Sequence, residues 1–384
     1  MPCRPPRVGA GPGSGSAWRQ RSGRYPQVAT RSQRARTRPG HTSGVKERVI
    51  KLLDEGRGVL TAKQLASMGI GPAVLRTLLR EGTIRRVARG AYAKSAPSSP
   101  DTTAATPAAR ARAAEADHLT RLDALLLSYR PKVAASHQSA ALAWGMPVWR
   151  TLLDRVHLSY RRTGATTRKH DAFTIHRCQH EDAFTFHEGR PVVVAPLAVV
   201  GTAVEGGLRA GLITADGALR TGLTTKEQLE TWVSRLRHHP GLSSARAVLE
   251  HCDGSAESPG ESLLRLTLVQ LGVRFEAQHW IRVSDGSSYR VDFYLPDHGV
   301  VLEFDGAVKY SSGAHGDPTH DGADALVAEK VREDALRAEG YGVGRVTWSG
   351  LAAGTLAQVI LVASRQAQPR ARHHVSTPPD WWGR

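Results

Sequence analysis

Apolar positions in the first ordered part of the chain recur at helical spacing and then change to alternation. Such spacing around Leu52 predicts a first helix, and Thr61 is a predicted N-cap for a second one. A third helix is predicted for Pro72–Glu81, after a glycine- and proline-containing break. The segment Ile84–Tyr92 alternates polar and apolar residues and predicts a short β-hairpin. The expected order over residues 45–95 is therefore three helices followed by a hairpin.

The middle of the chain, residues 118–250, mixes both periods and predicts a joining α/β domain. Helices are expected around Leu119–Leu126, Ala134–Leu142, Ala195–Ala210 and Thr225–Arg237, and strands at Val156–Tyr160 and Phe173–Arg177. Asp216 is expected to be a capping or turn residue. This pattern assigns no chemistry to the segment.

The C-terminal segment, residues 255–362, predicts a helix, three strands, a second helix and a closing strand. The first helix opens at Ser258 and stops at Gly272. The remaining elements are expected at Phe275–Trp280, Tyr289–Leu295, Val300–Phe304, Ala323–Glu339 and Gly342–Trp348. Turns rich in Gly, Asp, Ser and Pro separate the strands.

The 384 residues give room for several domains, and the fold class expected is α+β multidomain. The expected boundaries are a disordered basic tail at 1–44, a first domain at 45–95, a linker at 96–117, the joining domain at 118–250, the C-terminal domain at 255–362 and a disordered tail at 363–384.

The formal net charge is +17 with a sequence pI of about 10.4, which favours a polyanionic partner, nucleic acid before membrane. Residues 1–44 supply +9 of this through nine arginines and no Asp or Glu. That tail is open to three interpretations: a phosphate-gripping arm, an organelle transit peptide, or a dispensable extension. The three scattered cysteines form no disulfide or metal spacing, and no apolar run reaches the roughly 18 residues of a membrane span. We therefore expect a cytoplasmic protein without a membrane partner.

Five arginines lie on the third helix and hairpin of the first domain: Arg76, Arg80, Arg85, Arg86 and Arg89. Leu60-Thr61-Ala62-Lys63-Gln64-Leu65, Leu78-Leu79-Arg80-Glu81-Gly82 and Arg89-Gly90-Ala91-Tyr92 resemble the N-terminal domain of abortive-infection antitoxins of type IV toxin–antitoxin systems. The resemblance implies a winged-helix fold that binds DNA, with these arginines at a major groove and on the wing. Arginines there neutralise phosphates or pair with guanine edges. The alternative is a solvated basic face that docks protein.

Acidic residues mark two strands of the C-terminal segment. Glu303 and Asp305 would share one face of a strand, because side chains alternate along it, and Asp292 lies on the preceding strand. Carboxylates gathered on a buried strand repel each other and are costly to desolvate, and a divalent cation relieves both effects. Magnesium prefers such oxygen ligands.

The order of these elements is that of the PD-(D/E)XK nuclease core. Gly260-Glu261-Ser262-Leu263-Leu264, Val291-Asp292-Phe293, Glu303-Phe304-Asp305-Gly306 and Glu329-Lys330-Val331-Arg332-Glu333-Asp334 resemble the very-short-patch-repair endonuclease family. The resemblance implies a restriction-endonuclease-like core, DNA as substrate and Mg²⁺ (or Mn²⁺) as cofactor. By position, Asp292 and Glu303 are the implied metal ligands and Glu261 the acidic residue of the first helix. Glu261 also fits a capping box that begins at Ser258, which would explain it without chemistry.

The sequence departs from the family pattern at Asp305, which stands where a lysine is usual. An aspartate cannot supply a cation, so Asp305 is either a further metal ligand or a spectator. Lys309 and Lys330 are candidate replacements, and we prefer Lys330 as the catalytic lysine because it shares a helical face with Asp334. The alternative is a simple ion pair between Lys330 and Asp334.

His137, His157 and His176 have spacings that match no common zinc pattern, and no cysteine is close in sequence. Structural or hydrogen-bonded surface roles are expected for them. Ser136 and His137 are adjacent, and adjacent side chains are not expected to face each other as a nucleophile and base would.

The function expected is a metal-dependent DNA endonuclease in phage defence, mobile-element biology or repair. One alternative is a catalytically inactive DNA-binding regulator of antitoxin type, which the substitution at Asp305 favours, and another is an RNA-directed nuclease. A homodimer and a partner toxin or antitoxin are compatible with these interpretations.

Overall fold

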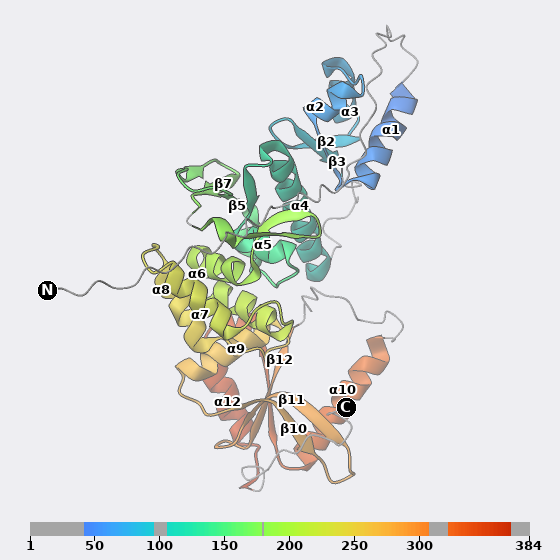
Figure 1. Ribbon diagram of the computed structural model, residues 1–384. Helices are drawn as coiled ribbons and strands as arrows, with labels where there is room; N and C mark the ends of the chain where they lie inside the picture. Colours follow the sequence, from blue (N-terminus) through green and yellow to red (C-terminus); the bar gives the residue numbers. More distant parts are fainter. Residues whose placement is uncertain (1–41, 96–105, 179, 307–321, 370–384) are drawn as a thin grey trace, which may run out of the picture. The chain divides into compact units, whose positions relative to one another are not determined.

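The computed structural model describes residues 42–95, 106–178, 180–306 and 322–369 (Figure 1). It confirms an α+β chain with several sheets, as expected. Most of the predicted basic tail, the first part of the predicted linker, Lys309 and most of the predicted C-terminal tail lie outside the described residues.

The first domain has the predicted order of three helices and a hairpin, beginning at Thr42. Its elements are α1 (Thr42–Glu55), β1 (Val59–Thr61), α2 (Ala62–Ser67), α3 (Pro72–Arg80), β2 (Ile84–Ala88) and β3 (Ala91–Lys94). Thr61 caps α2 in a capping box with Gln64, as its sequence position predicts. The strands form an antiparallel sheet in the order β1-β3-β2, with Gly90 at a φ of +73° in the turn. Apolar faces of the three helices close a small core over this sheet.

The next part of the chain is built on a six-stranded sheet in the order β6-β7-β5-β4-β9-β8. Its strands are β4 (Val133–Ala135), β5 (Val156–Tyr160), β6 (Arg168–Lys169), β7 (Phe173–His176), β8 (Phe184–His187) and β9 (Arg190–Val193). Its helices are α4 (Pro107–Tyr129), α5 (His137–Ala143), η1 (Arg150–Asp154), η2 (Glu181–Ala183), α6 (Ala195–Arg220), α7 (Lys226–Arg235) and α8 (Leu242–His251). The sheet and helices share one hydrophobic core.

Two expectations for this part are corrected. Residues 107–117, predicted as linker, belong to α4, which Thr106 caps. Asp216 is no turn residue: it lies inside α6, is 1% exposed, and pairs with Arg265 at 2.8 Å between Oδ2 and Nη2. Such a buried charge is tolerated only with a partner of this kind.

Helix α6 runs ten residues further than predicted and continues across a kink at Gly207. Its length and composition would allow it to cross a membrane, although no continuous apolar run in the sequence indicated this. However, 61% of its most apolar stretch of 18 residues is buried inside the protein, as in the core helix of a globular domain.

The C-terminal domain surrounds a four-stranded sheet in the order β10-β11-β12-β13. Its elements are α9 (Pro259–Gln270), β10 (Glu276–Arg282), β11 (Ser288–Leu295), β12 (Val300–Asp305), α10 (Gly322–Ala338), β13 (Gly342–Thr347), α11 (Trp348–Ala352) and α12 (Leu356–Ser364). The first three strands are antiparallel and β13 runs parallel to β12. One face packs on α9 and α12, and the other on α10 (Figure 1). The observed order agrees with the predicted one up to β13. Helices α11 and α12 were not predicted, and α12 extends to Ser364, into the tail that was expected to be disordered.

Candidate functional site

A row of polar residues crosses the C-terminal sheet at one level. Phe293 pairs with Leu302, so one further step brings Asp292 opposite Glu303. On the other side of Asp292, the register of β10 and β11 brings Gln278 opposite it. Residues directly opposite each other on antiparallel strands present their side chains on the same face. The sequence-predicted carboxylates Asp292 and Glu303 are thus neighbours across two strands.

The ladder between β11 and β12 ends where these two acids begin. Instead of a strand carbonyl, the Oδ2 atom of Asp292 accepts the backbone N–H of Phe304 at 2.8 Å. The strands therefore separate at Asp292. The Asp292 carboxylate accepts the N–H of Phe304, a backbone donor that the pairing of β11 with β12 does not use.

Glu261 approaches the same row from the first turn of α9. Its Oε2 atom accepts hydrogen bonds from the Gln278 side chain and the Glu257 backbone N–H, both at 2.9 Å. Ser258 caps the backbone N–H of Glu261 at 3.2 Å. Only this half of the predicted capping box is present, because the Glu261 carboxylate turns to Glu257 and Gln278 instead of the Ser258 backbone.

Gly260 allows this approach. A Cβ atom at that position would lie 2.0 Å from the ring of Phe304, the residue between Glu303 and Asp305. A glycine before Glu261 is therefore required for α9 to pack on β12 at the level of the acids.

Burial raises the pKa of all three carboxyl groups. Desolvation, followed by the charge of Asp292, raises the pKa of Glu261 to about 7. Desolvation also raises the pKa of Asp292 and of Glu303, and in both cases the positive charge of Arg332 opposes the effect. The charge of Asp292 thus acts on both Glu261 and Glu303, and Arg332 offsets the effect of burial at Asp292 and Glu303.

The cation that meets Glu303 is one that sequence reasoning missed. Arg332 of α10 pairs with Glu303 and donates to the backbone carbonyl of Arg290 at 2.7 Å. Lys330, the predicted catalytic lysine, is exposed on the same helix, and in the described chain no ion pair joins it to Asp334. Asp305 is exposed at the end of β12. Arg332 lies two residues after Lys330 and therefore about 200° round α10, on the face opposite to Lys330.

The acids fit Mg²⁺ in donor chemistry but not as an assembled set of ligands. Carboxylate oxygens are the ligands that this ion prefers. Yet Glu303 is held by Arg332 and Asp292 by the Phe304 amide. Among the described residues, the group of three potential ligand atoms lying within 4.8 Å of one another is made of histidines, and the three acids do not form such a group. A cation there would have to displace Arg332 from Glu303.

The predicted DNA-contacting arginines differ in how free they are. Arg76 and Arg80 on α3, and Arg86 and Arg89 in the hairpin, are exposed. None of these four forms an ion pair with a carboxylate in the described part of the chain. Arg85 instead pairs with Asp117 of α4 at 2.6 Å. The Arg85 guanidinium is therefore already engaged in an ion pair within the protein.

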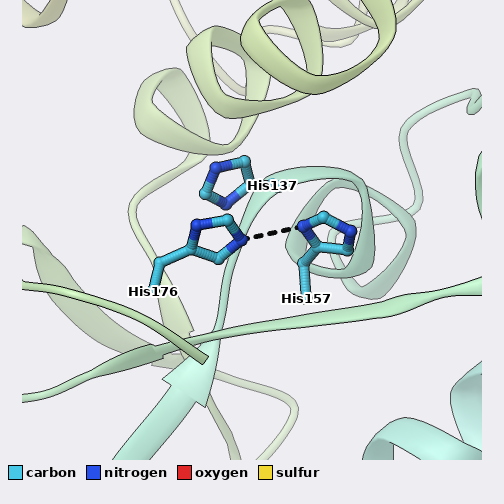
Figure 2. Close-up of side chains that lie close together, drawn as sticks. All are labelled: His137, His157 and His176. Carbon is cyan, nitrogen blue, oxygen red and sulfur yellow. Dashed lines mark hydrogen bonds between the residues drawn. The ribbon is translucent and has the colours of Figure 1, made fainter. Parts of the chain in front are cut away.

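The three histidines treated as unrelated in sequence meet in space. His137 at the start of α5, His157 in β5 and His176 in β7 offer ring nitrogens that all lie within 4.8 Å of one another (Figure 2). Ser136 and His137 also interact, at 3.0 Å between Oγ and Nδ1, contrary to the expectation for adjacent residues. The signal available in sequence was only that His157 and His176 fall on adjacent alternating segments.

Comparisons with known proteins found a family match in the first domain and relatives that match a part of the chain. The family described as transcriptional regulator, AbiEi antitoxin, matches residues 47–93. Two proteins of Mycobacterium tuberculosis are each 34% identical over 103 residues: "Uncharacterized protein MT2308" of strain CDC 1551 / Oshkosh and "Uncharacterized protein Rv2248" of strain ATCC 25618 / H37Rv. The matched region is 27% of this chain and spans 38% of each relative's length. The similarity of the first domain to the antitoxin family thus agrees with its predicted resemblance.

Proposed function

We propose that the protein is a DNA-binding regulator of antitoxin type, whose first domain is a winged helix that contacts duplex DNA. The observation that carries this proposal is the set of exposed arginines without carboxylate partners on α3 and the β2–β3 hairpin, within the described region that matches the antitoxin family. A partner toxin and a homodimer belong to the same proposal.

The arrangement of the first domain suits this role. Helix α3 follows α2 after a short turn and begins at Pro72, as the second helix of a helix-turn-helix does. Arg76 and Arg80 are four residues apart and so extend from the same face of α3. On DNA this face would enter a major groove, and Arg86 and Arg89 of the hairpin would reach the flanking phosphates.

The C-terminal domain, in this proposal, is a nuclease-like core that has lost its catalytic cation. Asp305 stands in place of the usual lysine, and Arg332 supplies Glu303 with a permanent positive charge. An arginine cannot lower the pKa of a water as a bound metal ion does. The domain would then stabilise the chain or bind DNA without cutting it.

The test is fluorescence anisotropy of the full chain with labelled duplex DNA over a salt series. Arg76→Ala with Arg80→Ala is expected to weaken binding and to lower the slope of log affinity against log salt by about 2, because each arginine neutralises one phosphate. The paired control is Arg48→Ala with Lys51→Ala, which removes the same charge from exposed positions on α1. Equal losses of affinity in both variants would mean that only net charge matters and would contradict the proposal.

A second candidate function, a Mg²⁺-dependent DNA endonuclease, is favoured by one observation. Glu261, Asp292 and Glu303 are desolvated acids, the charge of Asp292 acts on both glutamates, and the pKa of Glu261 is raised to about 7. Raised carboxyl pKa values cluster at catalytic sites. When bound, Mg²⁺ would lower the pKa of a water and offset charge on the phosphate. Asp292 and Glu303 would hold the ion, Glu261 would accept a proton, and Lys330 or Arg332 would contact the phosphate.

Plasmid cleavage with Mg²⁺ or Mn²⁺ distinguishes the two candidates. The endonuclease predicts cleavage that Asp292→Asn and Glu303→Gln each abolish, while both variants retain DNA binding. The regulator predicts an intact plasmid with wild type and variants alike, across supercoiled, linear and single-stranded substrates. An RNA substrate in the same assay tests the RNA-directed alternative.

A further inference from the structure

Three imidazole rings converge in the domain built on the six-stranded sheet, away from both sites described above. The Nδ1 atom of His157 and the Nε2 atom of His176 are 2.9 Å apart (Figure 2). The ring of His137 stacks on that of His176, with centroids 3.9 Å apart. Each ring comes from a different element, α5, β5 or β7, so the fold rather than a local motif brings them together.

The surrounding chain fixes the positions of the rings. A Cβ at Gly201 of α6 would lie 3.0 Å from Cα and Cγ of His137, a tight contact that would press on this ring. The Ser139 hydroxyl accepts the backbone N–H of His157 at 2.8 Å and holds this residue of β5 to α5. His137 is further held at a φ of +52°, a conformation that residues with a side chain rarely adopt.

The outward-facing nitrogens have polar neighbours that orient the rings. Nδ1 of His137 lies 3.0 Å from the Ser136 hydroxyl. Nε2 of His157 is buried without a hydrogen bond, but the Glu205 carboxylate is 3.7 Å from it. In the metal-free protein the hydrogen bond between Nδ1 of His157 and Nε2 of His176 occupies both atoms, so a bound ion would replace this hydrogen bond. A hydrogen-bonded neighbour on the far nitrogen is the usual support of a metal-binding histidine.

Burial of the three rings favours their neutral form. Desolvation is the main cause that lowers the pKa of His157 to about 3 and that of His176 to about 4, and it holds the pKa of His137 well below its ordinary value. Neighbouring histidines add to the effect, because two imidazolium ions at this distance repel each other. The neutral form is the one that binds metal ions.

We propose that His137, His157 and His176 together bind one transition metal ion of the zinc class. Zinc–nitrogen bonds of about 2.1 Å in a tetrahedron place two ligand nitrogens about 3.4 Å apart, between the 2.9 Å of the closest pair and the 4.8 Å limit of the group. Rotation of His137 and His176 out of their stacked arrangement would bring the three nitrogens onto one ion. Imidazole nitrogen is a preferred ligand of zinc, copper and nickel, and three histidines leave a fourth position open.

That open position faces a cavity of about 100 Å³. His137 and His176 line it together with Ser136, Arg177 and His239. The volume accommodates a few water molecules or a small anion beside the ion. The site thus has the form of a metal centre with an exchangeable ligand, as three-ligand zinc sites have, rather than that of a closed four-ligand structural site.

The experiment uses the full chain, purified without a histidine tag and stripped with a chelator. Zn²⁺ alone is added, excess metal is removed by dialysis, and the bound ion is counted by mass spectrometry. One ion per chain is expected for wild type and for His238→Ala, an exposed histidine in the same part of the chain. His157→Gln and His176→Gln are each expected to lower retained zinc at least tenfold. The proposal is overturned if a variant that combines His157→Gln with His176→Gln retains zinc, or if the wild type retains no zinc.

A second measurement on the wild type alone decides the matter if the variants do not fold. X-ray absorption of the zinc-loaded chain is expected to show imidazole scattering from three histidines and one light-atom ligand. A Co²⁺ titration is expected to saturate at one ion with the intense visible absorption of a tetrahedral site. Weak uptake at many sites, or an octahedral Co²⁺ spectrum without imidazole scattering, overturns the proposal.

Discussion

The first domain and the C-terminal domain place their charged residues in opposite environments. On α3 and the β2–β3 hairpin, four arginines are exposed and, within the described chain, lack carboxylate partners. In the C-terminal domain, three acids are largely buried, and burial raises the pKa of each. Exposed charges cost little free energy and remain available to a polyanion, whereas buried charges destabilise the fold unless something neutralises them. The cations of the first domain thus remain available to a polyanion, whereas the acids of the C-terminal domain need neutralising charge.

Removal of Arg332 tests the internal neutralisation and has the largest expected effect. The Glu303 side chain is 15% exposed and that of Arg332 31%, so Arg332→Ala leaves a mostly buried carboxylate beside Asp292 without its cation. We expect a loss of about 3 kcal/mol in the free energy of unfolding, at the low end for a buried pair because Arg332 is partly exposed. Urea denaturation measures this loss.

Lys330→Ala is the control for that variant, because Lys330 is exposed on the same helix. Its effect is expected to stay within about 0.5 kcal/mol. Saturating Mg²⁺ sharpens the result. If the acids bind Mg²⁺, the ion is expected to restore the stability of Arg332→Ala. If they do not, added Mg²⁺ is expected to leave its stability unchanged. A loss of less than about 1 kcal/mol without added metal would contradict the internal neutralisation.

The pH dependence of stability tests the burial of Glu261. Its pKa is about 7 in the folded protein and ordinarily 4.5, so between these values the folded state binds more protons than the unfolded state. This residue's contribution to stability is therefore present at and below about pH 4.5 and is lost as pH rises to 7. Glu261→Gln keeps an acceptor for Gln278 and removes the titration. We expect it to exceed wild type by about 3 kcal/mol at about pH 8 and to equal it near pH 4.5.

Urea denaturation at the two pH values, in a chelator, measures this difference. In Mg²⁺ the advantage of Glu261→Gln at the higher pH is expected to shrink only if the acids bind the ion. Equal stability of variant and wild type at the higher pH in chelator would show that Glu261 is not desolvated as the structure indicates.

The ion pair of Arg85 has the smallest expected effect and tests the contrast among the arginines. Arg85 and Asp117 are 38% and 40% exposed, so Arg85→Ala is expected to cost no more than about 0.5 kcal/mol, measured by thermal unfolding. Its effect on DNA affinity is expected to be smaller than that of Arg80→Ala, whose side chain forms no ion pair with a described carboxylate. Equal losses of affinity would mean that the Asp117 pair opens on DNA.

Local patterns were enough to predict the elements of both end domains. The capping sequence at Thr61, the break before Pro72 and the alternation of β12 all act within a few residues, and the structure shows each of them. Strand alternation predicted a shared face for Glu303 and Asp305, but the place of Asp292 beside Glu303 came from the register of β11 and β12. The ion-pair partner of Glu303 could not be predicted either, because helical periodicity alone cannot say which face of α10 meets the sheet. That face carries Arg332 instead of Lys330.

The sequence by itself determined the order of elements, the basic first domain and the acids of the C-terminal strands, since these depend on local spacing and composition. The tertiary structure decided that Asp216 is a buried partner of Arg265, that Glu261 turns to Gln278, and that His137, His157 and His176 share one place. These contacts join residues 17 to 49 positions apart along the chain. No local rule relates such positions, because the packing of whole helices and sheets sets which of them meet.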